Sequence, residues 1–301
     1  MPTLLVDTYS LFFRSFYGLP PMNTAAGLPT NALYGFSSLL LKLLREERPE
    51  AGAFALDLPT PSFRHALAPS YKAGRPATPG PLRQQLTLLP ELLDAFGFAQ
   101  HAAEGFEADD VLASLAQRLA EPFRAAEPAA ASAEGPRVLI ASGDRDLLQL
   151  VDDQIHVLFL GQRGKPAKRY APVSVHERFG VPAAQLPAYV ALVGDSSDNL
   201  PKVAGIGEVT ASRLIAEYRD IDTLLAHLPE LSDARLGAKL RAHADQMRAS
   251  EQLARLRTDV PLTRGPLSGA FDKAAAARAH ALFEKLEFKS LLPRLTPWLE
   301  A

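Results

Sequence analysis

Acidic side chains stand where three apolar runs of this sequence end. These are Asp7, Asp57 and Asp144, and Asp146 follows two residues after the last of them. Runs of this kind predict buried strands, and ligands of an open parallel sheet bind beyond the carboxyl ends of its strands. We therefore expect the acids to meet at one edge of a sheet. The acids at or just after predicted strand ends are Asp7, Asp57, Glu107, Asp109, Asp110, Asp144 and Asp146.

The chemistry that these acids predict is metal binding. One aspartate at a strand end is often a helix N-cap, and for Asp7 or Asp109 alone that explanation is equally good. It fails for the whole set, because clustered carboxylates repel one another unless a cation neutralises them. Oxygen ligands without histidine or cysteine suit Mg²⁺ or Mn²⁺.

A further acidic pair stands later in the chain. Asp195 and Asp198 are three residues apart, so they would share one side of a helical turn. A solvated turn is the alternative explanation of this pair. Together with the first group, the pair predicts two metal ions roughly 4 Å apart, as in nucleases that bind the attacking and leaving oxygens.

A glycine hairpin follows that pair directly. Gly205 and Gly207 flank one apolar residue, and Thr210 stands near the start of a predicted helix, Ala211–Tyr218. The glycines allow a tight turn whose backbone N–H groups point outward at a helix N-terminus. This predicts a phosphate site, although an ordinary helix–helix turn has the same pattern. The absence of a predicted strand before it argues against a dinucleotide-binding fold.

Strands separated by helices make up the first half of the chain, which predicts an α/β fold with a mostly parallel sheet. From about Tyr170 onward helical patterns dominate. We therefore expect an α/β domain over residues 1–169 and an all-α region over residues 170–301. Glu121–Pro136 is expected to be a surface loop. The predicted strands span residues 3–7, 51–57, 98–104, 137–144 and 154–161. One helix is predicted over Ala32–Arg48, and another is predicted to begin near Glu107.

The composition fits a globular protein. The chain has 301 residues, of which 47% are apolar and 22% charged, and it has no cysteine, which excludes disulfides and thiolate metal sites. The apolar N-terminal run meets Asp7 at once and no long apolar window follows. We thus expect no signal peptide, no membrane span and a cytoplasmic location. Setting the nine acids aside turns the net charge of −2 into +7, so charge does not exclude a nucleic-acid partner.

Taken in order, these motifs resemble the bacterial 5′-3′ exonuclease and flap endonuclease family, which includes the N-terminal nuclease domain of bacterial DNA polymerase I. The resemblance extends from residue 3 to about residue 295. It implies a PIN-like, mostly parallel sheet domain with a helical arch, followed by an all-α helix-three-turn-helix module, and it implies that all nine acids bind metal. It is carried by Asp7, Asp57, GFEADD (105–110), SGDRDLLQL (142–150), GDSSDNLP (194–201) and GIGEVTA (205–211).

The proline-rich basic segment Pro59–Pro81 is long for a connection in a compact domain. Its Tyr71, Lys72 and Arg75 match a signature of the family's arch. The resemblance implies that Lys72 and Arg75 approach the scissile phosphate and that Tyr71 stacks on a base. A solvated basic loop is the alternative. The other residues expected to contact DNA are Arg14, Lys202, Gly205, Gly207 and Thr210.

The function implied by the resemblance is that of a stand-alone, two-metal 5′-3′ exonuclease and 5′ flap endonuclease. Its cofactors would be two Mg²⁺ ions, replaceable by Mn²⁺, and the sequence leaves open whether K⁺ binds the helix-three-turn-helix module. Its partners would be DNA with 5′ ends, flaps or junctions, with RNA primers as an overlapping substrate, and the protein would be a monomer. Thr8, Leu58 and Lys202 replace residues usual in the family, but no ligand is lost.

Three other functions stay open. The first is a catalytically weak protein that only binds flap junctions. The complete set of acids argues against it, because such a protein would not need them all. A phosphatase with an aspartate nucleophile usually needs a second aspartate two residues later, where Tyr9 stands. An RNA nuclease of the wider PIN class would differ in its preference for RNA over DNA. The balance of exonuclease and flap cutting, the protein partners and the pathway are also undecided.

Overall fold

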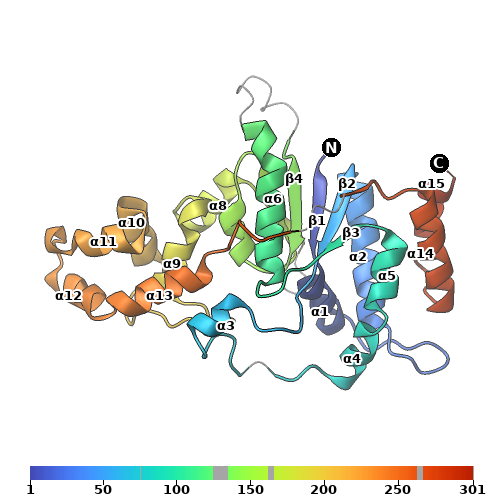
Figure 1. Ribbon diagram of the computed structural model, residues 1–301, viewed down its shortest axis with the longest axis horizontal. Coiled ribbons are helices and arrows are strands. Elements are labelled where there is room, and N and C mark those ends of the chain that lie inside the picture. The colour runs from blue at the N-terminus through green and yellow to red at the C-terminus, as the bar shows by residue number, and fades with distance from the viewer. Residues whose placement is uncertain (75, 125–134, 162–165, 263–266, 301) are drawn as a thin grey trace.

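A seven-stranded sheet forms the centre of the computed structural model, which describes residues 1–74, 76–124, 135–161, 166–262 and 267–300 (Figure 1). The strands are β1 (Thr3–Asp7), β2 (Ala51–Ala55), β3 (Ala99–His101), β4 (Val138–Ser142), β5 (Ile155–Phe159), β6 (Lys168–Tyr170) and β7 (Ser268–Gly269). Their order is β3-β2-β1-β4-β5-β6, with β7 against β2. β1 to β5 run parallel, whereas β6 and β7 are antiparallel to their neighbours.

The central strands are apolar on both faces because helices cover both sides of the sheet. Every residue of β1 and β4 is buried. Their side chains alternate between two cores: Leu5 and Ile140 face one core, whereas Leu4 and Leu139 face the other. A continuous apolar run of this kind is typical of a parallel strand buried on two faces, which explains why the sequence predicts these strands correctly.

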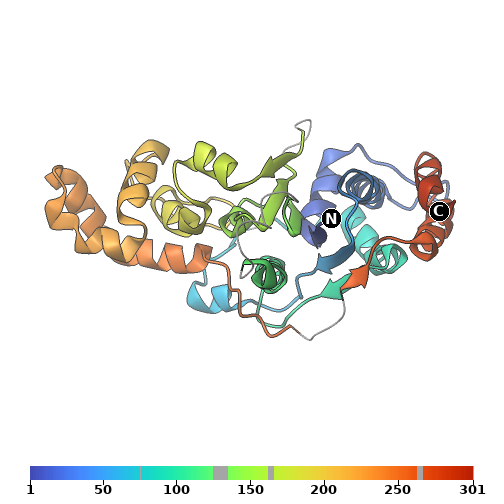
Figure 2. The same cartoon turned by 90° about the horizontal axis from the view of Figure 1, so that it is seen from above.

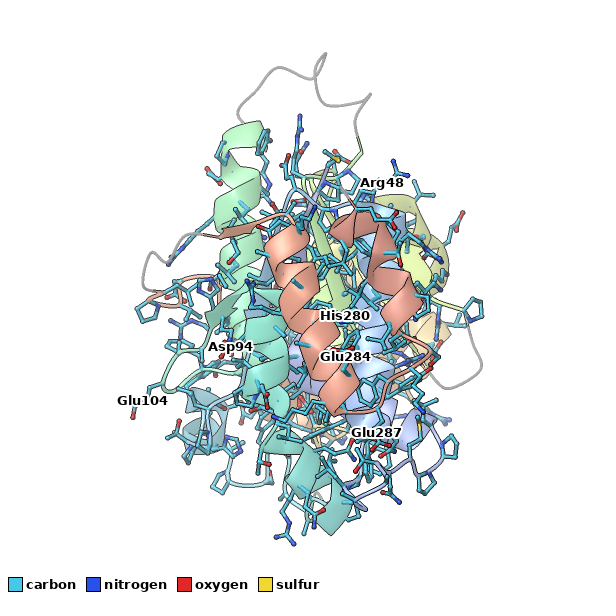
Figure 3. All side chains as sticks on the ribbon, turned by 90° about the vertical axis from the view of Figure 1, so that its right-hand side faces the viewer. Arg48, Asp94, Glu104, His280, Glu284 and Glu287 are labelled. Carbon is cyan, nitrogen blue, oxygen red and sulfur yellow. The ribbon has the colours of Figure 1, made fainter. Side chains whose placement is uncertain are left out.

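Each face of the sheet has its own helical layer. On one face α6 (Ala108–Arg124) contacts β1, β2 and β4. On the other face, helices from both ends of the chain enclose an aromatic core that includes Phe54, Phe96 and Phe283. Figure 3 shows the last two helices on this side, with α5 beside them. The helices of this layer are α1 (Thr8–Gly18), α2 (Asn31–Glu47), α5 (Leu89–Phe96), α14 (Lys273–Lys285), η4 (Leu292–Leu295) and α15 (Thr296–Leu299).

Between β6 and β7 the chain forms a helical lobe, residues 172–254, that extends away from the sheet (Figures 1 and 2). The helix at its base, Leu186–Val193, packs against the last helix of the lobe and shares a core with α6. The elements of the lobe are α8 (Pro172–Phe179), η2 (Ala183–Gln185), α9 (Leu186–Val193), α10 (Glu208–Tyr218), α11 (Ile221–Ala226), η3 (Leu228–Glu230), α12 (Ala234–Ala242) and α13 (Ala244–Ala254).

The strand order has a switch point at the carboxyl edge of the sheet, between β1 and β4. β1 lies beside β4, and the strands that follow each of them lie on opposite sides, so their connections diverge. The segment that contains α3 (Phe63–Leu67) and α4 (Gly80–Leu86) crosses this edge (Figure 1). The short helix η1 (Asp146–Leu150) begins just after β4. Asp7 at the end of β1, the loop after β4 and the crossing segment therefore all lie at this edge.

The predicted elements are right in outline and wrong in several details. The sequence analysis omits α1, β6 and β7, and β7 lies in the region expected to hold only helices. Glu121 to Arg124 belong to α6 and not to a loop, and residues 125–134 of that predicted loop lie outside the described residues. The domain boundary near Tyr170 stays a prediction. No helix of the described part of the chain is long and apolar enough to cross a membrane.

Candidate active site

Asp7 lies at the centre of the carboxyl edge, where β1 ends and α1 begins. It is 3% exposed, its Oδ1 accepts a hydrogen bond from the Ser10 amide at 3.3 Å, and its Oδ2 accepts one from the Ser142 hydroxyl. Burial raises the pKa of Asp7 to about 7, and repulsion from Asp144 and Asp57 adds to the rise, which the Ser142 hydrogen bond partly offsets. Asp7 thus serves as the N-cap of α1 and also belongs to the acidic cluster.

The loop after β4 contributes two acids. Asp144 Oδ1 accepts a hydrogen bond from the Asp146 amide at 3.0 Å, and the Asp144 amide donates to the Ser142 hydroxyl at 2.8 Å. Burial raises the pKa of Asp144 and holds that of Asp146 well above its ordinary value. Repulsion from Asp198 raises both further, so this loop faces the acidic pair of the helical lobe.

Glu107, just before α6, and Asp109, in its first turn, are the next two acids. Burial, followed by repulsion from Asp144 and Asp7, holds the pKa of Asp109 well above its ordinary value, so its carboxyl faces the same cluster. Glu107 differs: burial would raise its pKa, but the cations of Lys72 and Arg64, together with hydrogen bonds from Lys72 and Tyr71, lower it overall. Asp57 Oδ1 accepts a hydrogen bond from the Ala108 amide at 2.8 Å, which joins the end of β2 to the start of α6.

Asp110 is the exception among the predicted ligands. It is fully buried, and its carboxylate binds both terminal nitrogens of the Arg64 guanidinium, at 2.6 and 2.8 Å. The same oxygens also accept hydrogen bonds from the Glu107 amide at 3.2 Å and the Arg257 amide at 2.9 Å. Its carboxylate thus has protein partners on both oxygens. No sequence motif indicates the role of Arg64, because its partner is 46 residues away.

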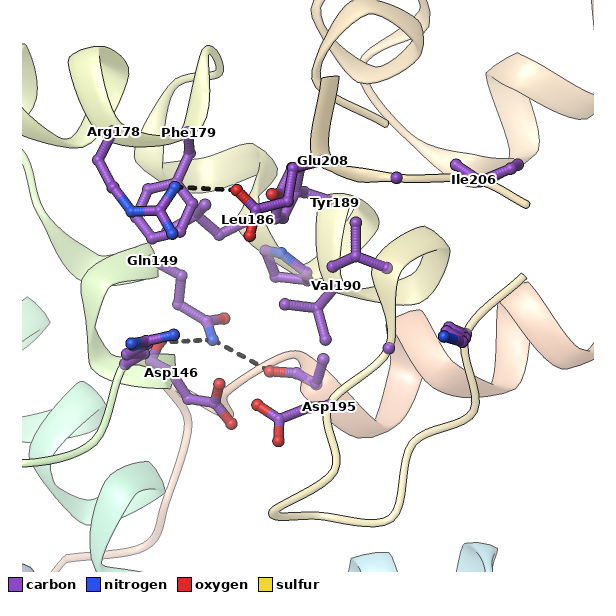
Figure 4. Close-up of a pocket in the computed structure, with 17 residues that line it drawn as sticks. Asp146, Gln149, Arg178, Phe179, Leu186, Tyr189, Val190, Asp195, Ile206 and Glu208 are labelled. Atoms are coloured by element: carbon purple, nitrogen blue, oxygen red, sulfur yellow. Dashed lines mark hydrogen bonds and ion pairs between the residues drawn. The ribbon is translucent and has the colours of Figure 1, made fainter. Parts of the chain in front are cut away.

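The acidic pair of the lobe lies in a tight loop and not on the expected helical turn. Gly194 begins this loop with φ at +76°, and Asp195 and Leu200 bond each other's backbones at 3.0 and 2.7 Å. Asp198 is 6% exposed and accepts a hydrogen bond from the Tyr71 hydroxyl at 2.8 Å. Asp195 instead faces Asp146 across a pocket of about 350 Å³ between the sheet edge and the lobe (Figure 4).

The crossing segment places two of its three predicted residues at the cluster. Lys72 Nζ lies 3.0 Å from Glu107 and 3.9 Å from Asp198, and its backbone φ is +53°. Tyr71 is only 4% exposed, and its hydroxyl donates to both of these acids. Base stacking by Tyr71 does not fit this arrangement, because the ring is already buried. Arg75 lies outside the described residues.

The cluster fits divalent cations in its chemistry. All its donors are carboxylate oxygens, and Asp7, Asp109, Asp144 and Asp146 all have raised pKa values because their negative charges are buried near one another. Among the described residues, no three acidic or histidine side chains are close enough to form a ready-made coordination shell. The structure thus brings the acids to one edge, while Lys72 supplies the positive charge there.

The glycine hairpin lies beside the pocket that Asp146 and Asp195 share. Gly205 has φ at +76°, and Gly207 is the N-cap of α10, with Thr210 in the first turn of that helix. A Cβ on Gly205 would lie 2.6 Å from Lys239 Nζ, so this ammonium on α12 lies against the turn. The sequence analysis did not identify Lys239. The exposed residue Lys202 lines the same pocket as the hairpin.

A basic groove of about 580 Å³ lies between α1, α2 and η4. The described residues that line it include no acid, and its cationic residues are Arg14, Lys42, Arg45 and Arg294. Burial lowers the pKa of Arg14, whose Nε donates to the Gly161 carbonyl at 2.7 Å. Lys42 and Arg45 lie 3.9 and 4.0 Å from the exposed Glu46. Of this groove the sequence analysis predicted only Arg14.

Two family models match the chain. The model "5′-3′ exonuclease, N-terminal resolvase-like domain" matches residues 2–180, and "5′-3′ exonuclease, C-terminal SAM fold" matches residues 181–275. DNA polymerase I of Mycobacterium tuberculosis is 40% identical over 303 residues, which cover 100% of this chain and 32% of the relative. The thermostable DNA polymerase I of Thermus thermophilus is 40% identical over 96% of this chain and 32% of the relative. The chain thus spans about a third of these relatives.

Solved structures confirm the predicted fold. The bacteriophage T5 flap endonuclease in complex with DNA and metal ions has a TM-score of 0.64 and 19% identity, covering 100% of this chain and 98% of that chain. The catalytic core of Rad2 in complex with DNA substrate has a TM-score of 0.61 and 15% identity, covering 97% and 92%. The family models and the polymerase relatives confirm the family expected from the motifs. The chain belongs to the 5′-3′ exonuclease family, whose members are nucleases that hydrolyse DNA.

Proposed function

We propose that this chain is a 5′-3′ exonuclease and structure-specific 5′ flap endonuclease that depends on divalent metal. The observation that carries the proposal is the convergence of buried, mutually repelling carboxylates on the switch point of the sheet. Lys72 and the pocket beside the glycine hairpin adjoin the same edge. The match to the nuclease family supports the assignment across residues 2–275.

The proposed metal is Mg²⁺, with Mn²⁺ as a substitute, because the donors are oxygens. When bound, two such ions supply neutralisation of the carboxylates and Lewis-acid activation of the water and the phosphodiester. The predicted ligands with clearly raised pKa values are the most direct candidates to hold the ions. They are Asp7, Asp109, Asp144 and Asp146, with Asp57, Glu107, Asp195 and Asp198 around them.

The chain's own residues orient the phosphodiester for hydrolysis. Water adds to phosphorus and the bond from phosphorus to the 3′ oxygen breaks, which leaves a 5′-phosphate and a 3′-hydroxyl. Lys72 Nζ, held between Glu107 and Asp198, supplies a fixed cation where charge develops on the phosphoryl oxygens. We assign the same role to Arg75.

Two surfaces are proposed to hold DNA on either side of this edge. The hairpin at Gly205 and Gly207, with Lys202 and Lys239 beside it, offers backbone N–H groups and cations to phosphates. The basic groove offers cations without acids and an exposed aromatic ring, that of Tyr17. Phosphates are the common partner of these cations and N–H groups, so binding should depend on DNA shape and salt and not on sequence.

The deciding experiment uses a 5′-flap DNA duplex with Mg²⁺, and the same reaction with a chelator. Asp144→Asn is expected to slow cleavage by at least about 100-fold, while DNA affinity stays near normal. Residues that only support a metal ligand usually contribute about 10- to 100-fold, and a direct ligand should contribute more. Asp153→Asn, an exposed acid before β5, is the matched control. Binding of the flap without cleavage by the unmodified protein would instead identify a junction-binding protein.

The remaining features of the proposal have their own tests. We propose that RNA primers are an overlapping substrate, which matched RNA and DNA flaps would test. K⁺ at the hairpin would be detected as a K⁺-dependent rise in duplex affinity at constant ionic strength. We further propose that the protein acts as a monomer in the cytoplasm, and sedimentation with and without DNA would test the oligomeric state.

A further inference from the structure

Arg64 is a buried arginine that joins three segments of the chain. Its side chain is 2% exposed and extends from α3 to the first turn of α6, where it binds Asp110 with both terminal nitrogens and Glu107 at 3.3 Å. Its Nε and Nη2 also donate to the backbone carbonyls of Leu253 and Arg255, at 2.8 and 3.2 Å, where α13 ends. One guanidinium thus holds the crossing segment, the acid-bearing helix and the helical lobe together.

The partners of Asp110 leave its carboxylate little capacity for another ligand. Oδ1 accepts from Arg64 and from the Arg257 amide, and Oδ2 accepts from Arg64 and from the Glu107 amide. A carboxylate has about four acceptor positions, and four donors occupy them here. Its neighbour Asp109 instead faces Asp144 and Asp7. These consecutive residues therefore have different partners: Asp110 binds Arg64, whereas Asp109 lies near the acidic cluster.

We propose that Arg64 and Asp110 are positioning residues: together they fix the first turn of α6, so that Glu107 and Asp109 face the reacting phosphate, and Asp110 itself does not bind metal. This inference rests on the proposed nuclease function. A planar guanidinium matches a carboxylate in two places at once, whereas an ammonium binds as a single point. The two-point contact therefore fixes the orientation of the Asp110 carboxylate as well as neutralising its charge.

The contact with α13 extends this role to the other half of the acidic cluster. α13 packs against α9, and the loop that carries Asp195 and Asp198 begins where α9 ends. Arg64 holds the end of α13 and the first turn of α6 in one arrangement. It thereby sets the position of the lobe acids relative to the sheet acids, on which a shared site for two ions depends.

The test compares Arg64→Lys, Asp110→Asn and the double variant with Ser114→Ala. Ser114 is a matched control, because it is buried on α6 and bonds the Arg257 carbonyl and the Val260 amide without touching the acids. Each single variant is expected to lower kcat between about tenfold and 100-fold, with KM for a flap substrate almost unchanged. The double variant should be no worse than either single one, since the two residues act as a unit.

The readout that a metal ligand would change is the number of Mn²⁺ ions bound, measured by electron paramagnetic resonance. Asp110→Asn is expected to bind as many ions as the unmodified protein, whereas Asp144→Asn should lose one. Loss of an ion in Asp110→Asn, or a kcat equal to that of Ser114→Ala, would overturn the inference. If Arg64→Lys fails to fold, Asp110→Asn decides by itself. An unmodified protein that cannot cleave would instead refute the proposed function.

Discussion

Burial changes what Tyr71 can contribute. Its ring is covered and its hydroxyl joins Glu107 to Asp198, so it links the sheet acids to the lobe acids. Tyr71→Phe keeps the ring and removes only this link. Hydrogen bonds to charged groups contribute about 1.5–3 kcal/mol each, so the variant should be less stable. It should also need about tenfold more Mg²⁺ for half-maximal cleavage, because the acids lose a shared partner.

A magnesium titration of flap cleavage and a thermal melt would measure both effects. Tyr170→Phe is the matched control, since that tyrosine is also buried, at 8% exposed, and lies on β6 at the edge of the sheet. If Tyr71→Phe behaved like the unmodified protein while Tyr71→Ala lost activity, the ring would be the important part. That outcome would restore a stacking role and contradict the hydroxyl link.

The ammonium of Lys72 is expected to contribute to turnover more than to affinity. Its Nζ lies 3.0 Å from Glu107 and 3.9 Å from Asp198, among the acids proposed to hold the metal ions. Lys72→Ala should lower kcat roughly 100- to 1000-fold, the usual effect of removing one group that stabilises transition-state charge. DNA affinity, measured by fluorescence anisotropy, should change little. Lys289→Ala, on the exposed surface after α14, is the control; a matching loss of affinity and turnover in Lys72→Ala would contradict this role.

At the scale of elements, the glycine hairpin can be tested with a matched pair of glycines. Gly205 and Gly97 have φ at +76° and +75°, and a Cβ on either would meet the end of a flexible cation, Lys239 or Arg278. Alanine at either position should cost about 1–2 kcal/mol of stability, because both residues are left-handed. Of these two variants, only Gly205→Ala should weaken duplex binding, by about tenfold, since only that turn is proposed to face phosphates.

The measurement is the dissociation constant of each variant for several duplex sequences. Gly207→Ala should also weaken binding. A Cβ there would meet no protein atom and would occupy the space from which a phosphate is proposed to approach the hairpin. The loss is expected to be equal for all sequences. A loss confined to some sequences would mean that the hairpin contacts base edges and would contradict phosphate binding.

How far the sequence predicts the elements depends on the length of their signals. β1 and β4 are buried throughout and mainly apolar because two helical layers cover them, so their positions and the acids that follow could be predicted. β7 has two residues and depends on pairing with β2, which leaves no periodic pattern to detect. α1 begins directly at the end of β1, and its run of aromatic and hydroxyl side chains has weak helix propensity.

For the site, the sequence predicts which acids meet but not how each side chain is oriented. Acids that end strands could be assigned to one edge, since parallel strands share a carboxyl end. The orientation of neighbouring acids could not be assigned, because Asp109 and Asp110 differ only in which side of α6 they face. That difference depends on Arg64, a partner distant in sequence. Burial of Tyr71 likewise follows from the packing of the lobe, which no local pattern encodes.

At the scale of the whole molecule, the acidic cluster should make stability depend on pH and metal. The folded pKa of Asp7 is about 7 against an ordinary value of 3.8, so the folded protein binds more protons between these values. Its contribution to stability is therefore present below about pH 4 and is lost as pH rises through about 7. Without metal, the protein should be less stable at about pH 8 than at about pH 5, by a few kcal/mol from this residue.

Denaturant melts at the two pH values, with a chelator and with Mg²⁺, would measure this difference. Mg²⁺ should restore stability at the higher pH, because an ion that binds only the folded state shifts the equilibrium toward it. Asp7→Asn has no charge to bury, so without metal it should be more stable than the unmodified protein at about pH 8. A variant less stable than the unmodified protein under those conditions would contradict the assignment.

The return of the chain from the helical lobe to the sheet also bears on how the protein is made. Phe271 and Phe283 complete the aromatic core around Phe96, and Ser268 and Gly269 pair with the start of β2. A nascent chain that has left the ribosome only as far as the lobe lacks these side chains. The core on that face of the sheet is therefore incomplete until the residues up to Phe283 have been synthesised. Until then, an apolar surface stays open to chaperones during translation.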